Sequence, residues 1–145
     1  MGHQNPIQGS LLLFRLAHHL GKPKGELVVY DPFYCQGSIR TLYEKIGVTN
    51  FIHEKRDFYA DVKAKRVPDY DILITNPPYS LNHKERIIAF VADSGKAWAL
   101  LMPNYVANKS YFLDQVSSMG SSCESVGLSP QVSAFYSLNG ALLSD

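Results

Sequence analysis

The chain has few cysteines and no long apolar run, and each absence excludes a class of protein. Its 145 residues include two cysteines, Cys35 and Cys123, with no metal-ligand spacing between them. We therefore expect no metal site, and a reducing, intracellular setting is the plain inference, with cytoplasm and nucleus not distinguished. No apolar run approaches the ~20 residues that span a bilayer, and no basic cluster followed by an apolar stretch begins the chain. We expect neither a membrane partner nor a secretory signal.

Charge of one sign is also lacking. The net charge is +1, from 14 basic and 13 acidic residues. A protein that grips duplex nucleic acid by itself usually carries a basic face. Here acidic residues are interspersed with the basic clusters, such as those at 63–66 and 84–86, so a solvated surface of mixed charge is the simpler interpretation. Charge leaves nucleic-acid binding open without supporting it.

Apolar patterning predicts an α/β domain. A hydrophobic fraction of 46% provides a core for one domain of ordinary size. The expected strands are 26–30, 50–53, 70–75 and 97–102, and the expected helices are 8–20, 38–46 and 84–91. Strands that alternate with helices indicate βαβ units and a parallel sheet. Ligands of such sheets bind at the carboxyl ends of the strands, so we expect the functional residues in the loops there.

The last third of the chain differs in composition. Between residues 115 and 145 serine recurs and only Glu124 and Asp145 are charged. Short strands are expected at 125–128 and 132–138, and little else. We expect a single domain over residues 1–145, with a core at about 8–114 and a weakly structured tail after it.

The strongest motif is Asn76-Pro77-Pro78-Tyr79, which directly follows the expected strand 70–75. Its two prolines lock φ, remove two backbone donors and keep Asn76 out of the helical region. The loop is therefore stiff, and its carbonyl oxygens are aimed outward. A rigid turn without a chemical role is the ordinary alternative for four such residues taken alone.

These four residues suit chemistry on a planar NH₂ group. Such a nitrogen is a poor nucleophile, because its lone pair is delocalised into a ring or a carbonyl. The amide oxygen of Asn76 and the backbone carbonyl of Pro77 can each accept one N–H, which favours tetrahedral nitrogen and directs the lone pair at a methyl donor. Tyr79 would stack on the substrate. Most of the rate gain would come from positioning and preorganised acceptors.

The loop at residues 31–38, after the first expected strand, is a candidate cofactor loop. A strand, a tight loop and a helix present backbone N–H groups and a helix N-terminus to a ligand. Asp31 can accept hydrogen bonds from a cationic cofactor amine. Gly37 is the only glycine of the loop, so the dinucleotide fingerprint is absent, which argues against an NAD enzyme. A strand that ends in Asp-Pro is also typical of an ordinary turn.

The second expected strand is followed by further candidates. Glu54 lies 23 residues after Asp31, where an acidic residue can bind ribose hydroxyls in a nucleoside-binding α/β fold. Asp57 and Phe58 can supply an acceptor and an apolar wall for an adenine ring. The competing interpretations are a surface glutamate for Glu54, and a turn residue beside a core aromatic for the pair.

In this order the motifs resemble class I S-adenosylmethionine-dependent methyltransferases of the N6-adenine type. The resemblance covers about residues 26–105. It implies a Rossmann-like, mostly parallel twisted sheet of seven strands, with helices on both faces and S-adenosylmethionine bound across the first strand loops. The residues it assigns to the cofactor are Asp31, Pro32, Tyr34, Gly37, Glu54, Asp57 and Phe58. Those it assigns to catalysis are Asn76, Pro77, Pro78 and Tyr79.

The chain departs from the family pattern in two places. Cys35 stands where the cofactor loop usually has a second glycine, so its backbone must not need a positive φ. Residues 115–145 barely provide the antiparallel hairpin that completes the family's sheet. We therefore expect an incomplete C-terminal hairpin and an exposed sheet edge.

Three further residues are candidates for the substrate cleft. His83 follows the tetrapeptide and equally suits the start of a helix, and Asn104 and Tyr105 follow the last expected strand. The favoured substrate is the N6 amino group of adenine, so the expected partner is DNA or RNA. The alternatives are the amide of a protein glutamine, because the same tetrapeptide serves that chemistry, and a methyltransferase-like module without activity.

Overall fold

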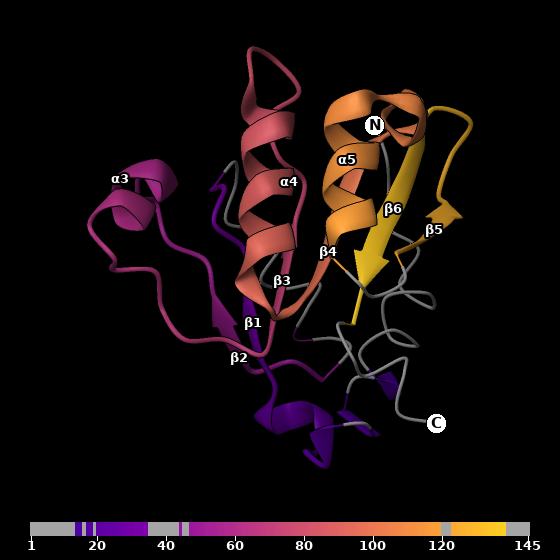
Figure 1. Ribbon diagram of the computed structural model, residues 1–145. Coiled ribbons are helices and arrows are strands. Elements are labelled where there is room, and N and C mark those ends of the chain that lie inside the picture. The colour runs from indigo at the N-terminus through magenta and orange to yellow at the C-terminus, as the bar shows by residue number, and fades with distance from the viewer. Residues whose placement is uncertain are drawn as a thin grey trace.

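The computed structural model describes residues 14–15, 17–18, 20–34, 44, 47–119 and 123–138. Within these ranges six strands form one mixed sheet in the order β2-β1-β3-β4-β6-β5 (Figure 1). The strands are β1 (Val28–Tyr30), β2 (Asn50–Ile52), β3 (Ile72–Thr75), β4 (Ala97–Pro103), β5 (Glu124–Gly127) and β6 (Val132–Ser137). The α-helices described are α3 (Phe58–Lys63), α4 (His83–Ser94) and α5 (Ser110–Ser118), with 3₁₀ turns η1 (Lys24–Glu26) and η2 (Asn104–Asn108).

One half of the sheet is parallel. β1 pairs with β2 and β3, and β3 pairs with β4, all in the parallel sense. The four strands expected from the apolar runs are confirmed, and the fold is α/β as expected. Because parallel strands end at the same edge of a sheet, the loops after β1, β2, β3 and β4 lie along one edge.

The other half of the sheet is an antiparallel hairpin. β6 runs antiparallel to β4 from Trp98↔Ser137 to Pro103↔Val132, and β5 runs antiparallel to β6. The sheet is therefore mixed, and the parallel arrangement applies to β2, β1, β3 and β4. The expectation of an incomplete C-terminal hairpin is wrong, because β6 pairs with β4 from Val132 to Ser137 and with β5 from Ser133 to Tyr136. Strand β5, exposed over much of its length, forms this edge of the sheet.

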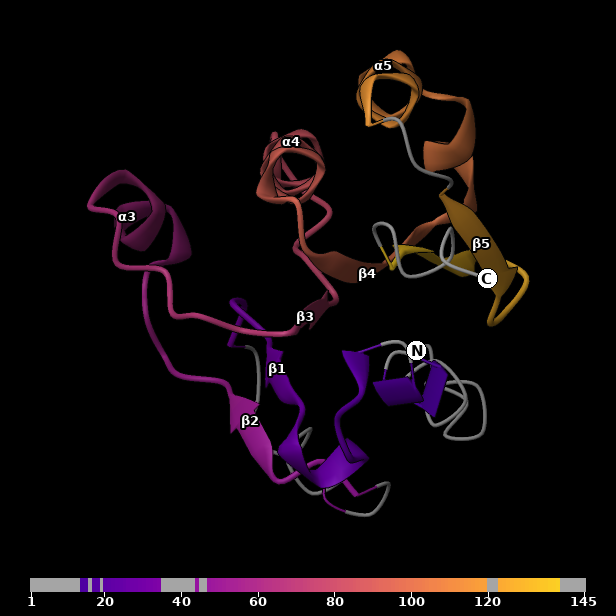
Figure 2. The same ribbon diagram turned by 60° about the horizontal axis from the view of Figure 1, so that its bottom comes forward.

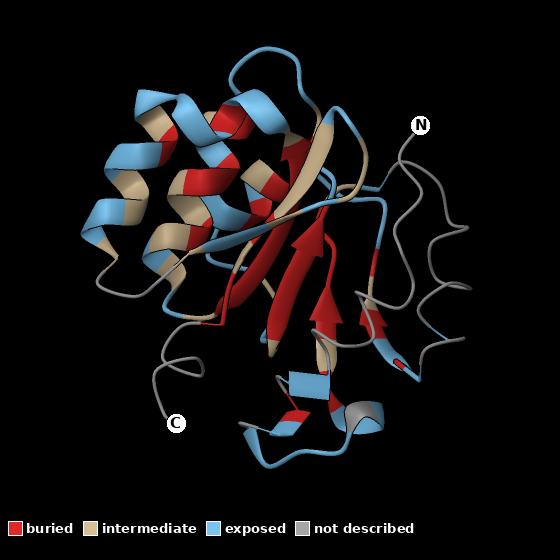
Figure 3. Ribbon diagram, turned by 90° about the vertical axis from the view of Figure 1, so that its right-hand side faces the viewer, coloured by how far each residue is buried: buried red, intermediate tan, exposed pale blue. Residues whose placement is uncertain are grey.

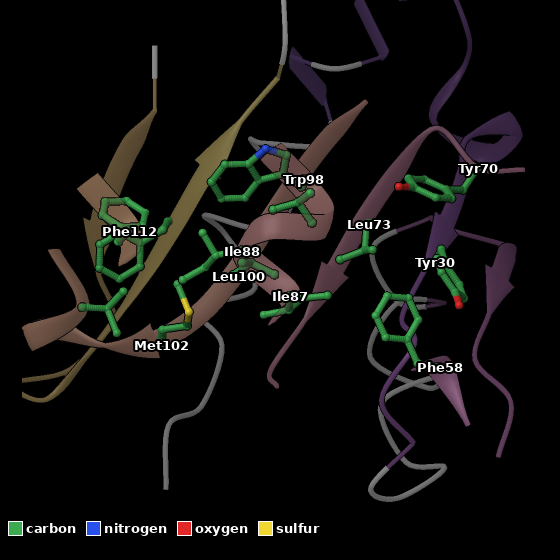
Figure 4. Packing of buried hydrophobic residues seen from close by; sticks show 13 residues of the cluster. Tyr30, Phe58, Tyr70, Leu73, Ile87, Ile88, Trp98, Leu100, Met102 and Phe112 are labelled. Atoms are coloured by element: carbon green, nitrogen blue, oxygen red, sulfur yellow. The ribbon is translucent and has the colours of Figure 1, made fainter. Parts of the chain in front are cut away.

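The helices α3, α4 and α5 lie along one face of the sheet (Figure 2). Their cluster of buried side chains includes Tyr30, Phe58, Leu73, Ile87 and Trp98 (Figure 4). The opposite face carries a second cluster, which includes Val29, Ile72 and Ala99 and reaches Ala17 near the N-terminus. Neighbouring residues of β1 and β3 thus face opposite clusters, as the alternation of a strand requires.

Burial on both faces explains why the strand signals in the sequence were continuous apolar runs. Every residue of β3 is buried, and β4 is buried from Ala97 to Met102 (Figure 3). Most of the expected helices 8–20 and 38–46 lies outside the described residues. Helices on both faces therefore stay a prediction, and the described α-helices that cover the sheet are on one face.

Two helices were not expected. Asp57 caps α3, where its Oδ1 accepts the backbone N–H groups of Tyr59 and Ala60 at 3.1 and 3.2 Å. Helix α3 has six residues, too few for a periodic pattern. Helix α5 extends to Ser118, so the first residues of the segment interpreted as a tail are helical, and Phe112 is its buried anchor.

Candidate functional site

Two of the predicted functional loops meet at the carboxyl edge of the sheet. Asp31 directly follows β1 and Asn76 directly follows β3, and these strands are neighbours. The Thr75 hydroxyl donates a hydrogen bond to Oδ1 of Asp31 at 2.5 Å. Both side chains are buried, with 2% and 8% of Thr75 and Asp31 exposed. The bond joins the expected cofactor loop to the expected catalytic loop one residue before Asn76.

Asp31 is held by more than Thr75. Its Oδ1 also accepts the backbone N–H of Phe33 at 3.2 Å, and its Oδ2 lies 3.6 Å from Nδ1 of His53. Burial raises the pKa of Asp31 to about 6, and the bonds from Thr75 and Phe33 together with His53 offset part of that rise. A carboxyl group in this state is ionised at neutral pH at a cost, and a cationic ligand beside it would recover part of that cost.

A cavity of about 110 Å³ lies beside the carboxyl ends of β1 and β2. It is lined by Tyr30, Pro32, Ile52, Glu54, Arg56, Phe58, Asp61, Arg66 and Pro68. Three predicted cofactor residues are among them: Phe58, 3% exposed, forms an apolar wall, Glu54 is an exposed carboxylate, and Pro32 is buried. Small-molecule sites are usually roughly 300–1,000 Å³, so this cavity would hold part of a ligand.

An ion pair in the cavity was missed by sequence reasoning. Arg56 donates from Nε to Oδ2 of Asp61 at 2.9 Å and from its terminal nitrogen to Oδ1 at 2.7 Å. This two-bond contact lowers the pKa of Asp61 and raises that of Arg56. It ties the loop after β2 to α3, which carries Phe58. A spacing of five residues between opposite charges is too common in sequences to have singled the pair out.

Of the other predicted cofactor residues, those that the structure describes (Asp31, Tyr34 and Asp57) are not among the residues that line the cavity. Asp57 is exposed and uses Oδ1 to cap α3, and it does not line the cavity, so its contact with adenine stays a prediction. Tyr34 is 40% exposed and its ring stacks on His53, with centroids 4.8 Å apart. Gly37 and Cys35 lie outside the described residues.

The tetrapeptide is fixed by hydrogen bonds at Tyr79, whereas the side-chain amide of Asn76 is exposed. Pro77 is buried and Pro78 half-buried, whereas Asn76 is exposed. The Tyr79 hydroxyl donates to the backbone carbonyl of Leu101 at 3.0 Å, and Nζ of Lys84 donates to the Tyr79 carbonyl. The loop is thereby attached to β4 and α4. Its Asn76 amide is open to a partner molecule, as is the 36% of Tyr79 that remains exposed.

His83 begins α4, as the helix-start interpretation predicted. Its Nδ1 lies 2.6 Å from the Tyr59 hydroxyl, and the two rings stack with centroids 5.5 Å apart. The guanidinium of Arg86, also on α4, lies 3.6 Å from the centroid of the Tyr59 ring. These contacts join α4 to α3. A contact of His83 with substrate stays a prediction.

Asn104 holds the hairpin. Its Nδ2 donates to the Pro130 carbonyl at 2.8 Å, and its Oδ1 accepts a hydrogen bond from the Ser133 hydroxyl at 2.6 Å. Its backbone N–H donates to the Gln131 carbonyl. Both ends of the side-chain amide are thus used between η2 and the turn from β5 to β6. This contact accounts for Asn104 structurally, and its expected place in the substrate cleft stays a prediction.

Comparisons of the chain with protein-family models, with curated proteins and with solved structures find no match. Among the described residues, no three metal-binding side chains cluster closely enough to hold a metal ion. Nor does the described part of the chain contain a helix of the length and apolarity that a bilayer crossing needs. The functional argument therefore depends on the geometry of the carboxyl edge.

Proposed function

We propose that the chain is an S-adenosylmethionine-dependent methyltransferase that acts on an exocyclic amino or amide nitrogen. The observation that carries the proposal is the Thr75–Asp31 hydrogen bond of 2.5 Å. It brings a buried carboxyl group, suited to a cationic cofactor amine, against a stiff Asn-Pro-Pro-Tyr loop suited to an NH₂ group. Direct transfer requires the reacting atoms at about 3–3.5 Å, so the loops that hold the methyl donor and its acceptor must be neighbours.

The sheet supports the proposal. A parallel group β2-β1-β3-β4 followed by an antiparallel hairpin is the arrangement that the resemblance to class I methyltransferases implies. The described sheet has six strands where that family has seven. A Rossmann-like architecture for the whole chain is part of the proposal.

We assign the nucleoside part of the cofactor to the cavity. Phe58 would pack against the adenine ring and Glu54 would accept the ribose hydroxyls. Asp31, which does not line the cavity, would bind the amino group of the methionine part. S-adenosylmethionine, when bound, supplies an electrophilic methyl group on a sulfonium sulfur. The side chains of this protein hold the cofactor and do not react with it.

The acceptors of the tetrapeptide orient the substrate. The Asn76 amide oxygen and the Pro77 carbonyl each accept one N–H of the NH₂ group, which localises the lone pair on nitrogen. Tyr79 stacks on the planar face, and its bond to Leu101 fixes the ring before substrate arrives. After transfer the methylated nitrogen carries one proton in excess, which stays on nitrogen, hydrogen-bonded to one of these two oxygens, until it passes to water.

The N6 amino group of adenine in DNA or RNA is the favoured substrate, because an exposed, fixed tyrosine ring matches a nucleobase in shape. For a base in a duplex, this requires flipping the nucleotide into the site. A glutamine amide would satisfy the same two acceptors and is the alternative.

The test is transfer of a tritiated methyl group to DNA, RNA and protein fractions in parallel. We expect label in nucleic acid, and we expect Asn76→Ala to lower the rate by about 100-fold or more, as loss of a preorganised group does elsewhere. Cofactor affinity, measured by calorimetry, should hardly change in this variant. Label in protein alone would select the glutamine alternative. If the parent chain neither binds S-adenosylmethionine nor transfers label, the chain is a module without activity.

A further inference from the structure

A second exposed tyrosine lies beside the tetrapeptide. Tyr105 is in η2, which follows β4, and it is 49% exposed. Lys84 connects the two tyrosines, because its Nζ bonds the Tyr79 carbonyl and lies 5.8 Å from the centroid of the Tyr105 ring. Lys109 approaches the same ring at 5.6 Å. We call Tyr79, Lys84, Tyr105 and Lys109 the two-tyrosine surface.

The composition of this surface points to one kind of partner. Exposed aromatic rings stack on nucleobases irrespective of their sequence, and an exposed ammonium group beside them neutralises a phosphate. Tyr105 and Lys109 are both exposed and accessible to a partner, whereas Lys84 is buried and its ammonium group is held on the Tyr79 carbonyl. The whole-chain charge of +1 gave no sign of this surface.

Two exposed tyrosines that both contact Lys84 can distinguish a single strand from a duplex. An enzyme acting on a duplex exposes the face of a single flipped base, whereas its neighbours stay stacked in the helix. A second stacking residue finds a partner only where the adjacent base is also unpaired. The pair Tyr79 and Tyr105 therefore favours a single strand over a duplex.

We propose that the two-tyrosine surface binds single-stranded nucleic acid, with Tyr79 on the target base, Tyr105 on a neighbouring base and Lys109 on a backbone phosphate. The role given to Tyr79 rests on the proposed function. The roles of Tyr105 and Lys109 concern binding, and they are measurable without any methyl transfer.

The experiment is fluorescence anisotropy with the whole chain, without a methyl donor, and a labelled adenine-containing oligonucleotide of roughly 12 nucleotides. We expect the single strand to bind more tightly than its duplex. Tyr105→Ala should weaken single-strand binding roughly 5- to 100-fold, the loss typical of one stacked base, and Tyr105→Phe should bind as the parent does. Lys109→Ala should reduce the slope of log affinity against log salt by about 0.7.

Two controls are matched to these variants. Leu113→Ala removes another exposed apolar side chain, on α5, and Lys63→Ala removes an exposed lysine on α3, at the other end of the helix layer (Figure 1). Both should bind the single strand like the parent. Circular dichroism and the thermal midpoint establish that each variant is folded before its affinity is compared.

The outcomes separate this inference from the proposed function. If the chain transfers methyl groups but folded Tyr105→Ala binds the single strand unchanged, or if the duplex binds as tightly, the inference is overturned and the function stands. If Tyr105 and Lys109 govern binding but no fraction is labelled, the inference is supported and the function fails. The inference would also be overturned if Tyr105→Ala lost only the methylation of a glutamine peptide and kept its affinity for the single strand, because Tyr105 would then contact a protein substrate.

Discussion

At the scale of single residues, Asp31 is the group whose chemistry depends most on its surroundings. Its sequence position, after an apolar strand, suggested a ligand for a cation. The structure adds that it is buried and bonded to Thr75, which the sequence did not indicate. Two strands 40 or more residues apart in the chain must become neighbours before this contact exists.

The raised pKa of Asp31 predicts a pH-dependent stability with a definite sign. Its folded pKa is about 6 against an ordinary value of 3.8, so the folded state binds more protons between these values. Stability contributed by the protonated group is therefore lost as pH rises through this window, by up to about 3 kcal/mol. Asp31→Asn, which can keep the bond from Thr75, should raise the thermal midpoint at about pH 8 and have little effect near pH 4.

The control for this prediction is Asp93→Asn, which neutralises an exposed carboxylate on α4. Its effect on the thermal midpoint should be small at both pH values. An Asp31→Asn protein that is less stable than the parent at about pH 8 would contradict the assignment of burial as the main cause of the raised pKa. The same variant should bind S-adenosylmethionine more weakly, because it lacks the negative charge for the cofactor amine.

At the scale of elements, α3 links stability to the cavity. The helix has six residues and carries Phe58, so its position determines one wall of the cavity. Its start depends on Asp57, and the Arg56–Asp61 ion pair holds it to the loop after β2. An aspartate that seemed a candidate ligand is thus also a helix cap.

Replacement of Asp57 separates these two roles. Asp57→Ala should lower the free energy of unfolding by about 1 kcal/mol, since two backbone N–H groups lose their acceptor. Asp57→Ser should recover most of the lost stability, because a serine hydroxyl also caps a helix. Its side chain is shorter and uncharged, so it would not replace a contact of Asp57 with adenine. Urea unfolding and calorimetry with S-adenosylmethionine measure the two effects. Recovery of stability without recovery of cofactor affinity would indicate a direct contact with adenine, and recovery of both would assign Asp57 to the cap alone.

Element predictions from the sequence succeeded where the signal was a continuous apolar run. The segment at 70–75 contains β3, and the run at 97–102 is β4 without its last residue. Helix α5 was not predicted although Phe112, Leu113 and Val116 have helical spacing, because the recurring serines of this region indicated a weakly structured tail. Tyr105 was a candidate for the cleft because it follows the strand 97–102, but the turn η2 that carries it could not be predicted, since a short 3₁₀ turn has no periodic signature.

At the scale of the whole molecule, the hairpin is part of the domain core. Phe135 of β6 is 2% exposed, and its ring packs edge-on against Phe112 of α5 with centroids 5.2 Å apart. Asn104 bonds the turn of the same hairpin to η2. The C-terminal segment therefore covers β4 and supports the turn that carries Tyr105.

Removal of this packing should destabilise the entire domain. Phe135→Ala should lower the free energy of unfolding by about 3–5 kcal/mol, the usual cost of deleting a buried phenylalanine ring. Gln131→Ala, at an exposed position of the preceding turn, should change it by less than about 0.5 kcal/mol. Both values come from urea titrations. A Phe135→Ala protein as stable as the parent would mean that the hairpin is an appendage and that residues up to 119 fold without it.

The sequence by itself determined the α/β class, the positions of the four parallel strands and the stiffness of Asn76–Tyr79. Each of these follows from local chemistry: apolar residues that must be buried, and prolines that restrict the backbone wherever they occur. Only the tertiary structure decided that Asp31 meets Thr75 and that Tyr105 lies near Tyr79. Those contacts join distant segments, and they depend on strand order and helix placement, which the packing of the complete core selects.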